Sequence, residues 1–376
     1  MKIAHIGPCN LPILFSRGGA IERRMVEMAY VQARRGNEVV VYSAETKVGD
    51  SFHDGYRIRA LKCICSGLPR RYEYLARAAS DLRRNPVDMI HFHSMPEGIW
   101  FSRSAVALKI LSYDFFRSRS WSHFPLYGLY RWTLQQFDWL FPVSEFCLEE
   151  SAQFWKLTSD RMRVLHNGVN LEQFRSDSAA GNALRDRFNL GSSPVVMYIG
   201  RVCEQKGTDV LIDAYVRLRE RMPEVRLVVA GPAELFGNTG SSPLVESIRA
   251  VGGLYLGPVD ESELAATYNL ATVFVIATRR DEMFGMAAIE AQACGKPVVC
   301  SRQGGLPEVI PETSGIHFPV GDSVALATTL ERVLTNQFLY DLLSKAAREN
   351  AMRFSWDAVV RELEQVCSEG SPLRKP

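Results

Sequence analysis

Residues 195–207 read Val-Val-Met-Tyr-Ile-Gly-Arg-Val-Cys-Glu-Gln-Lys-Gly. The first five are apolar and rich in β-branched side chains, which is typical of a buried strand. Arg201 and Lys206 follow directly, and a helical pattern begins near Asp209. Open α/β sheets bind anions where a strand ends in a turn that leads into a helix. The stretch therefore predicts an α/β fold with a basic anion site at the end of a strand.

Short apolar runs recur along the chain with helical patterns between them, as in a parallel sheet covered on both faces. The strands predicted in the first half are 2–6, 38–43, 89–93, 107–112, 139–143 and 163–165. Those predicted in the second half are 195–199, 226–230, 253–256, 273–276, 297–300 and 316–318. The pattern thus predicts two successive doubly wound units of similar construction.

A chain of 376 residues exceeds what one hydrophobic core usually organises, so two domains are expected. Small and polar residues gather between 176 and 193, where we place the linker. The predicted domains are therefore residues 1–178 and 179–355, followed by a last helix that begins at Trp356.

Composition indicates a globular protein, with 47% hydrophobic and 23% charged residues. No run of about 18 apolar residues is present. His5, Pro8 and Pro12 interrupt the apolar stretch that a signal peptide would need. A cytoplasmic location is the expectation.

Charge is distributed unevenly although the net charge is only +2. The first 180 residues hold more basic than acidic side chains, and Arg70, Arg77 and Arg84 would share one stripe of a helix. That stripe leaves open an acidic acceptor or peripheral contact with the inner face of a membrane, and a merely solvated basic face explains it equally well. No nucleic-acid partner is predicted, and the oligomeric state is left undetermined.

Cysteine and histidine patterns do not predict a metal site. The eight cysteines are scattered without Cys-x-x-Cys spacing, which favours buried free thiols. His91 and His93 end a predicted strand and point to the same face. Because no third ligand lies near them in sequence, no metal is predicted.

A second segment, Thr278 to Glu282, follows the predicted strand 273–276 and leads into a helix expected over 283–294. The helix is strongly apolar around Glu290, so a buried carboxylate there needs a hydrogen-bonding partner. Ribose hydroxyls would supply one. The backbone amides of residues 284–287 would direct partial positive charge toward a phosphate.

The Glu282-x7-Glu290 spacing, together with the Arg201 and Lys206 pair, resembles the signature of the retaining family 4 glycosyltransferases. The resemblance implies the GT-B fold, two facing Rossmann-like doubly wound domains with a cleft between them. It also implies that residues 356–376 pack back on the first domain, which binds the acceptor, while the second binds the donor.

The activity implied by the resemblance is transfer of a sugar from a nucleotide-diphosphate sugar to a hydroxyl group, with retention at the anomeric carbon. UDP is the favoured nucleotide, as in UDP-GlcNAc or UDP-Glc. No metal or other cofactor is expected, and the chain has no Asp-x-Asp motif. The acceptor is expected to be a small molecule, such as an aminocyclitol or antibiotic precursor, or a lipid-linked cell-envelope component.

The resemblance also assigns roles to individual residues. Arg201 and Lys206 would hold the diphosphate, Glu282 would contact the sugar, and Glu290 would bind the ribose. The donor-binding set is Gly18, Gly19, Arg201, Lys206, Glu282, Phe284, Gly285, Met286 and Glu290. The catalytic set is Arg201, Lys206, Glu282 and His93.

The acceptor side of the site carries a departure from the family pattern. After the predicted strand 107–112 many relatives have His-Asp or His-Gly, whereas this chain has Tyr113-Asp114. Tyr113, Asp114 and His93 are the predicted acceptor contacts. The family has a histidine near the reacting sugar at the position of His93, and a packed strand-end histidine is the structural alternative.

Two rival functions remain at this point. A nucleotide-sugar epimerase or a phosphorylase can be built on the same two domains. A non-catalytic protein that only binds a nucleotide sugar is the second rival, although such a protein would be expected to lose some of the residues assigned above.

Overall fold

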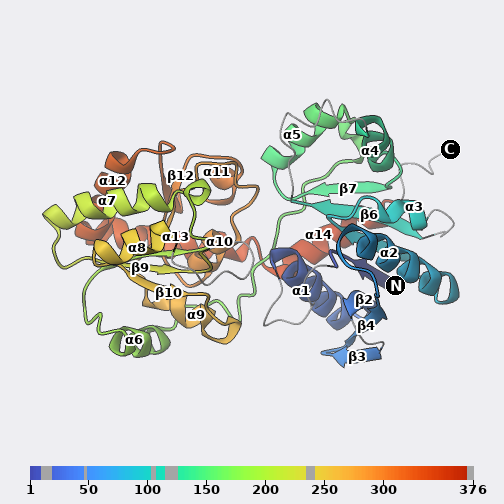
Figure 1. Ribbon diagram of the computed structural model, residues 1–376, viewed down its shortest axis with the longest axis horizontal. Helices are drawn as coiled ribbons and strands as arrows, with labels where there is room; N and C mark the ends of the chain where they lie inside the picture. The colour runs from blue at the N-terminus through green and yellow to red at the C-terminus, as the bar shows by residue number, and fades with distance from the viewer. Residues whose placement is uncertain (10–18, 46–48, 103–106, 115–125, 234–241, 371–376) are drawn as a thin grey trace. The chain divides into compact units, whose positions relative to one another are not determined.

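The computed structural model describes residues 1–9, 19–45, 49–102, 107–114, 126–233 and 242–370 (Figure 1). The chain divides into two compact units, residues 1–168 with 356–376, and residues 169–355. Each unit is built on one sheet.

The first unit contains a seven-stranded sheet with the order β3-β4-β2-β1-β5-β6-β7. All neighbours are parallel except β3 and β4, which form an antiparallel hairpin at one edge. The strands are β1 (Lys2–Ile6), β2 (Glu38–Glu45), β3 (Gly49–His53), β4 (Tyr56–Lys62), β5 (Met89–His93), β6 (Leu108–Tyr113) and β7 (Trp139–Pro142). The helices are α1 (Ala20–Arg34), α2 (Gly67–Arg84), α3 (Gly98–Phe101), α4 (Tyr127–Leu134), α5 (Glu145–Trp155) and α14 (Trp356–Ser368), with a 3₁₀ turn at Ser159–Arg161.

The second unit contains a six-stranded sheet with the order β10-β9-β8-β11-β12-β13, and every neighbouring pair is parallel. The strands are β8 (Val195–Ile199), β9 (Arg226–Ala230), β10 (Leu254–Gly257), β11 (Val273–Ile276), β12 (Val298–Ser301) and β13 (Gly315–Phe318). The helices are α6 (Ser178–Arg187), α7 (Thr208–Arg221), α8 (Pro243–Ala250), α9 (Glu261–Leu270), α10 (Met286–Ala293), α11 (Leu306–Val309), α12 (Ser323–Thr335) and α13 (Gln337–Met352), with the 3₁₀ turn η3 (Glu204–Lys206).

The predicted doubly wound α/β fold is confirmed in both units. In each sheet the strand order reverses direction beside the first strand of the unit, β1 or β8, and ligands bind at such reversals outside the carboxyl ends of the strands. Two details differ from the prediction. Residues 163–165 are not a strand, since only the neighbouring Met162 forms an isolated bridge to Leu140. The β3–β4 hairpin was not predicted, because β3 is mostly polar and exposed, and charged residues interrupt the apolar ones in β4.

The boundary between the units falls at residue 168 rather than at the predicted 178. The reason is that the segment before α6 is bound to α9, since Gln173 Nε2 donates to Glu261 Oε1 at 3.0 Å and the ring of Phe174 packs on Tyr268. The backbone N–H of Asp177 donates to Oδ1 of Asn269 at 2.9 Å. Residues 169–178 are thus anchored in the second unit.

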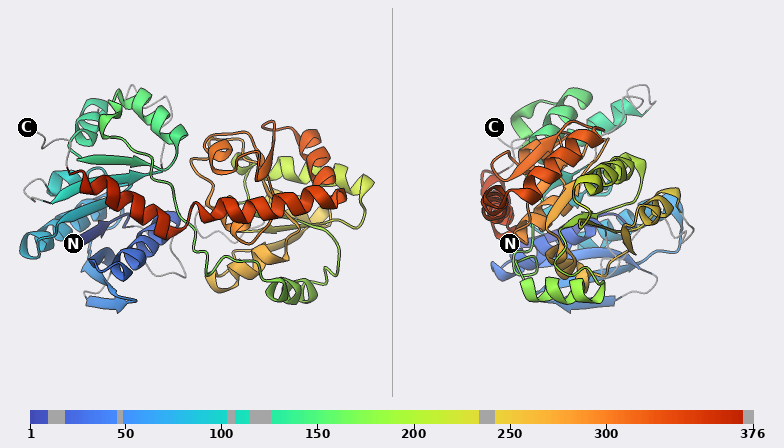
Figure 2. Two further views of the ribbon diagram at one scale, coloured as in Figure 1. Left: turned by 180° about the vertical axis from the view of Figure 1, so that it is seen from behind. Right: turned by 90° about the vertical axis from the view of Figure 1, so that its left-hand side faces the viewer.

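The last helix, α14, lies against α1 in the first unit (Figures 1 and 2). Its apolar face buries Trp356, Val360 and Leu363 in the core that also holds Met25. Glu364 accepts hydrogen bonds from the side chains of Arg35 and Asn37 at the rim of this contact. Hydrophobic burial therefore holds the end of the chain to its first unit.

The basic helix α2 buries the apolar face that the sequence predicts, with Leu75, Ala78 and Leu82 inside. Part of its charge is compensated, since Arg77 forms an ion pair with Glu73 at 2.8 Å. Among the described residues no helix combines the length and the apolarity needed to cross a membrane.

Candidate functional site

Two loops at the carboxyl edge of the second sheet are tied together by backbone hydrogen bonds. One loop follows β8 and contains Arg201 and Lys206, and the other follows β11 and contains Glu282. The N–H of Arg279 and the hydroxyl of Thr278 both donate to the carbonyl oxygen of Gln205, at 3.1 and 3.2 Å. The predicted diphosphate and sugar residues therefore lie in neighbouring, mutually braced loops.

Lys206 and Glu282 form an ion pair, with Nζ 2.5 Å from Oε2. Both side chains are partly exposed, at 28% and 21%. The backbone of Glu282 is held separately, because its carbonyl oxygen accepts from the N–H of Gly305 at 2.8 Å. The pair joins the cation predicted for phosphate to the carboxylate predicted for sugar, so each one positions the other.

Arg201 differs from Lys206 in having no hydrogen bond or ion pair to its guanidinium within the described part of the chain. Its backbone is fixed instead, since the Tyr198 hydroxyl donates to its carbonyl oxygen at 2.7 Å. The side chain is half-buried at the end of β8. An uncompensated guanidinium on a fixed backbone can donate two parallel hydrogen bonds to a phosphate group.

Helix α10 begins at Met286 rather than at the predicted residue 283. Gly285 precedes it with φ of 91°, a left-handed conformation that favours glycine. The ring of Phe284 is buried against Phe354, with ring centroids 5.6 Å apart. Phe284 therefore serves the core with its side chain, and only its backbone remains as a candidate donor contact.

Glu290 is buried at 4% exposure, and its carboxylate has a partner inside the protein. The Tyr268 hydroxyl in α9 donates to Glu290 Oε2 at 2.7 Å. The sequence correctly indicates a buried glutamate that needs a partner, but Tyr268 was missed. No local pattern relates the two residues, which only the packing of α9 on α10 brings together. A carboxylate has several acceptor positions, so this bond leaves the ribose role of Glu290 a prediction.

In the first unit Gly19 is the N-cap of α1, and Gly18 lies outside the described residues. Gly19 has φ of −83°, so its conformation does not require glycine. Its N–H donates to Glu22 Oε2 at 3.0 Å, and burial raises the pKa of Glu22. A carboxylate from the same helix thus occupies the amide that was predicted to meet a diphosphate.

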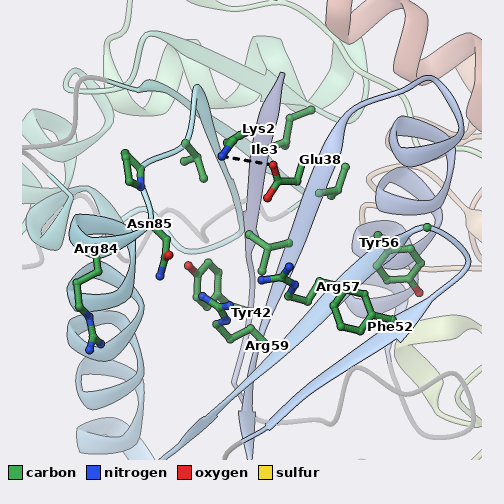
Figure 3. A pocket seen from close by; sticks show the side chains of 15 residues that line it. Lys2, Ile3, Glu38, Tyr42, Phe52, Tyr56, Arg57, Arg59, Arg84 and Asn85 are labelled. Carbon is green, nitrogen blue, oxygen red and sulfur yellow. Dashed lines mark ion pairs between the residues drawn. The ribbon is translucent and has the colours of Figure 1, made fainter.

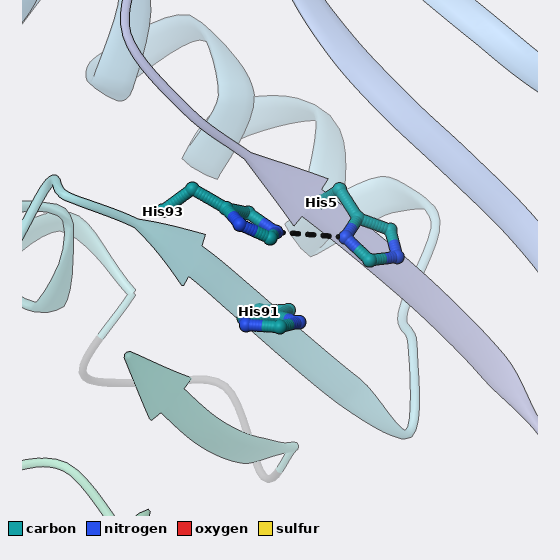
Figure 4. Close-up of side chains that lie close together, drawn as sticks. All are labelled: His5, His91 and His93. Atoms are coloured by element: carbon teal, nitrogen blue, oxygen red, sulfur yellow. Dashed lines mark hydrogen bonds between the residues drawn. The ribbon is translucent and has the colours of Figure 1, made fainter. Parts of the chain in front are cut away.

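His93 belongs to a buried group of three histidines that includes His5 and His91 (Figure 4). The parallel pairing of β1 with β5 sets His5 opposite His91, which brings in a third imidazole that sequence distance concealed. His5 Nδ1 lies 2.9 Å from His93 Nε2, and His91 Nε2 lies 2.7 Å from the Ser112 hydroxyl. All three side chains are at most 1% exposed.

One ring nitrogen from each of the three histidines lies within 4.8 Å of the others, which is close enough to hold a metal ion, but the orientation of the rings favours another arrangement. The rings of His91 and His93 stack with centroids 4.0 Å apart and 28° between their planes. An imidazole binds a metal through a lone pair in its own ring plane. Two stacked rings direct these lone pairs along separate planes, so this arrangement favours a hydrogen-bonded cluster.

Burial lowers the pKa of all three histidines, and His5 reaches about 4. The buried Arg24 guanidinium lowers each of them further. On acidification, these histidines therefore bind protons near pH 6.5 in the unfolded chain and only at lower pH in the folded protein. This contribution to stability is complete above about pH 6.5 and is lost as the pH falls toward the folded-state pKa values.

We therefore expect the free energy of unfolding to fall as the solution is acidified from about pH 7 to about pH 5. Each histidine that must gain a proton contributes up to about 1.4 kcal/mol per pH unit. Urea unfolding of the wild type and of His91→Leu measures this slope, which should be shallower in the variant. His53→Gln, on the edge strand β3, is the control and should keep the wild-type slope. Equal slopes in the wild type and His91→Leu would contradict the assignment.

The predicted acceptor residues Tyr113 and Asp114 occupy different environments. Tyr113 is buried at 5% exposure, and this burial raises its pKa. Asp114 is half-buried and accepts a hydrogen bond from the Ser94 hydroxyl at 2.9 Å. Ser94 follows His93 directly, so Asp114 lies beside the carboxyl end of β5, where His93 is the last residue of the strand. Asp114 is thus better placed than Tyr113 to meet a ligand.

A pocket of about 320 Å³ lies at the amino ends of the strands of the first sheet, on the side opposite to the carboxyl ends (Figure 3). It is lined by residues at the amino ends of β1, β2 and β4, including Lys2, Glu38, Tyr56 and Arg57, and by Arg84 at the end of α2. None of the predicted site residues lines it. Because ligands of doubly wound sheets bind at the carboxyl edge, this pocket is not the candidate active site.

Two family models match the chain. The model described as Glycosyltransferase Family 4 matches residues 18–173, and the model described as Glycosyl transferases group 1 matches residues 182–350. The two matches follow the two structural units and together cover more than half of the chain.

Curated relatives agree with these matches. D-inositol 3-phosphate glycosyltransferase of Xylanimonas cellulosilytica is 33% identical over 240 residues, 60% of this chain and 55% of the relative. The chain spans about half the length of this and similarly named relatives. Phosphatidyl-myo-inositol mannosyltransferase of Mycobacterium leprae is 28% identical over 380 residues, 96% of this chain and 97% of the relative.

Solved structures show the same fold at low sequence identity. Sucrose-phosphate synthase from Thermosynechococcus elongatus matches with a TM-score of 0.80 and 21% identity, over 98% of both chains. Anabaena Alr3699/HepE in complex with UDP-glucose matches with a TM-score of 0.79 and 18% identity, over 98% of this chain and 100% of that one. With both family models and the shared fold, the chain belongs to the family 4, group 1 glycosyltransferases of the GT-B fold.

Proposed function

We propose that the protein is a retaining, metal-independent glycosyltransferase that uses a nucleotide-diphosphate sugar. The observation that carries the proposal is the braced pair of loops in the second unit. They hold Arg201 with an uncompensated guanidinium beside Lys206, which pairs with Glu282 at 2.5 Å. This arrangement supports a site in which the cations would bind a diphosphate and the carboxylate would contact sugar hydroxyls.

In the proposed reaction, the bond between the anomeric carbon and the diphosphate breaks while the acceptor oxygen forms a new bond on the same face. The acceptor proton passes to an oxygen of the departing phosphate. Arg201, Lys206 and the first turn of α10 would stabilise the charge that grows on the leaving group. These positive groups would do the work that a divalent cation does in other transferases.

We favour a UDP-sugar as donor and a hydroxyl of a cyclitol as acceptor. Anabaena Alr3699/HepE, which shares the fold, is described in complex with UDP and with UDP-glucose. Two relatives are named for D-inositol 3-phosphate and phosphatidyl-myo-inositol. The acceptor can be a free small molecule or a lipid-linked one.

The test begins with thermal shift measurements using UDP, GDP and ADP, followed by donor sugars and acceptor pools analysed by mass spectrometry. We expect UDP to raise the melting temperature most and a UDP-sugar to yield a glycosylated cyclitol. Epimerised donor, or a sugar phosphate formed with inorganic phosphate, would favour the first rival. Binding without any turnover would favour a non-catalytic protein.

We expect Glu290→Gln to weaken UDP binding by about tenfold, because a neutral amide accepts a ribose hydrogen bond less strongly than a carboxylate does. The glutamine oxygen can still accept from Tyr268, so the fold should survive. Tyr268→Phe is the matched control, since it removes the internal hydrogen bond and leaves the carboxylate in place. Isothermal titration should show a smaller loss of UDP affinity for Tyr268→Phe than for Glu290→Gln, because the carboxylate that accepts from the ribose is kept. Equal affinities of Glu290→Gln and wild type would remove Glu290 from the ribose site.

A further inference from the structure

A buried hydrogen-bond chain in the first unit runs from α1 through β1 to the last residue of β5. Gln32 Oε1 lies 2.7 Å from His5 Nε2. His5 Nδ1 lies 2.9 Å from His93 Nε2, and this contact is drawn as a dashed line in Figure 4. The three side chains are at most 1% exposed. Water therefore does not compete for these bonds, and each proton position constrains the next.

The protons can be assigned from the ends of the chain. An amide oxygen only accepts, so His5 Nε2 must carry a hydrogen and donate to Gln32. His5 is neutral because burial lowers its pKa to about 4, so its Nδ1 has a lone pair and accepts from His93 Nε2–H. Burial also keeps His93 neutral. The remaining nitrogen, His93 Nδ1, is then an acceptor.

The positive charge of Arg24 also opposes protonation of the two imidazoles. Arg24 is 5% exposed and lowers the pKa of both His5 and His93, so both rings remain neutral. The opposite direction of donation along the chain would leave an N–H on His93 Nδ1 without an acceptor among the described residues.

We propose that Gln32 and His5 are positioning residues that set the tautomer of His93, so that Nδ1 of His93 accepts a hydrogen bond from a substrate hydroxyl. This inference rests on the proposed glycosyltransferase function. His93 ends β5 at the carboxyl edge of the sheet, where ligands of this fold bind. Its Nδ1 has no hydrogen-bond partner among the described residues, and buried polar atoms in that condition require an explanation. A sugar or acceptor hydroxyl would satisfy it.

The tautomer itself can be observed without any activity. In protein with ¹⁵N-labelled histidine, long-range ¹H–¹⁵N spectra distinguish a protonated ring nitrogen from one with a lone pair. We expect His93 to show a protonated Nε2 and a bare Nδ1, with its signals assigned by their loss in His93→Gln. Gln32→Leu removes the terminal acceptor and should shift His93 toward the other tautomer. A protonated Nδ1 in the wild type would overturn the proposal.

Kinetics test the consequence for the reaction. We expect Gln32→Leu and His5→Leu to lower kcat by about tenfold or more, since a histidine in the wrong tautomer loses its function even when its geometry is kept. His5→Asn should recover much of the loss, because its amide oxygen can take the place of Nδ1 and accept from His93. If these variants also hydrolyse the donor more slowly when no acceptor is present, the hydroxyl belongs to the donor sugar. Loss of transfer alone would assign it to the acceptor.

The control is Tyr42→Phe, which removes an equally buried hydrogen bond outside the chain, that of the Tyr42 hydroxyl in β2 to Asp81 in α2 at 2.7 Å. It should leave kcat within about twofold of wild type, because independent sites have separate effects. If it lowers kcat as far as Gln32→Leu does, the role is structural and the proposal fails. The proposal is also overturned if the wild type is active and both Gln32→Leu and His5→Leu keep its kcat. A wild type inactive with every donor refutes the proposed function instead, and the spectra still test the tautomer.

Discussion

Lys206→Ala is expected to lower turnover by about a hundredfold or more, which is the scale for removing one preorganised group that stabilises transition-state charge. Lys206 sits in the turn after β8 with Nζ 2.5 Å from Glu282, and the turn is braced through Gln205. Its position is fixed before substrate binds. A cation that meets growing negative charge on the leaving group should affect kcat more than the KM for the donor.

The measurement is steady-state kinetics with the best donor found by screening, together with a melting curve. Lys345→Ala is the matched control, because Lys345 also pairs with a glutamate, Glu349, but lies on the exposed surface of α13. It should leave turnover unchanged. Glu282→Gln separates the two roles of the pair, since it frees Lys206 while keeping a side chain that can contact sugar. Wild-type turnover of a folded Lys206→Ala would remove the lysine from the catalytic site.

Gly207→Ala is expected to cause the largest loss of stability, more than about 4 kcal/mol, with insoluble protein as the extreme outcome. Gly207 has φ of 70°, and a Cβ atom added there would lie 1.7 Å from the carbonyl oxygen of Ala277. That carbonyl belongs to the backbone of the loop after β11 and cannot rotate away. The variant must therefore separate the two loops that carry Lys206 and Glu282.

Gly191→Ala is a control that separates the cost of the left-handed backbone conformation from the cost of the clash with Ala277. Gly191 also has a positive φ, 53°, but no atom lies within 4 Å of its added Cβ. It should lose only about 1–2 kcal/mol, the cost of the left-handed conformation for a residue with a side chain. Urea unfolding of both variants measures the difference. If Gly207→Ala is no less stable than Gly191→Ala, the close approach of the two loops is wrong.

Much of the fold could be predicted because its signals are local. The runs 2–6, 89–93, 195–199, 226–230 and 273–276 are strands with the predicted bounds, since a buried parallel strand is a short continuous apolar run. The edge hairpin β3–β4 was not predicted because neither of its strands is such a run. Edge strands face water and mix charged with apolar residues, so they lack this signal.

The candidate donor site was also partly predictable. Arg201, Lys206 and Glu282 each follow a predicted strand, and the carboxyl ends of parallel strands share one edge of the sheet. Their approach to one edge therefore follows from strand direction alone. The ion pair between Lys206 and Glu282 does not, because it depends on how the two loops are braced.

Local sequence patterns were enough to predict most buried strands, the positions of the cations and carboxylates after them, and the edge of each sheet that these residues reach. The tertiary structure supplied the long-range partners: Tyr268 for Glu290, and His5 and Gln32 for His93. Periodicity and turn residues act over a few positions of the chain. Hydrogen-bond partners across strands and helices depend on register and packing, which join residues far apart in sequence and leave no local pattern.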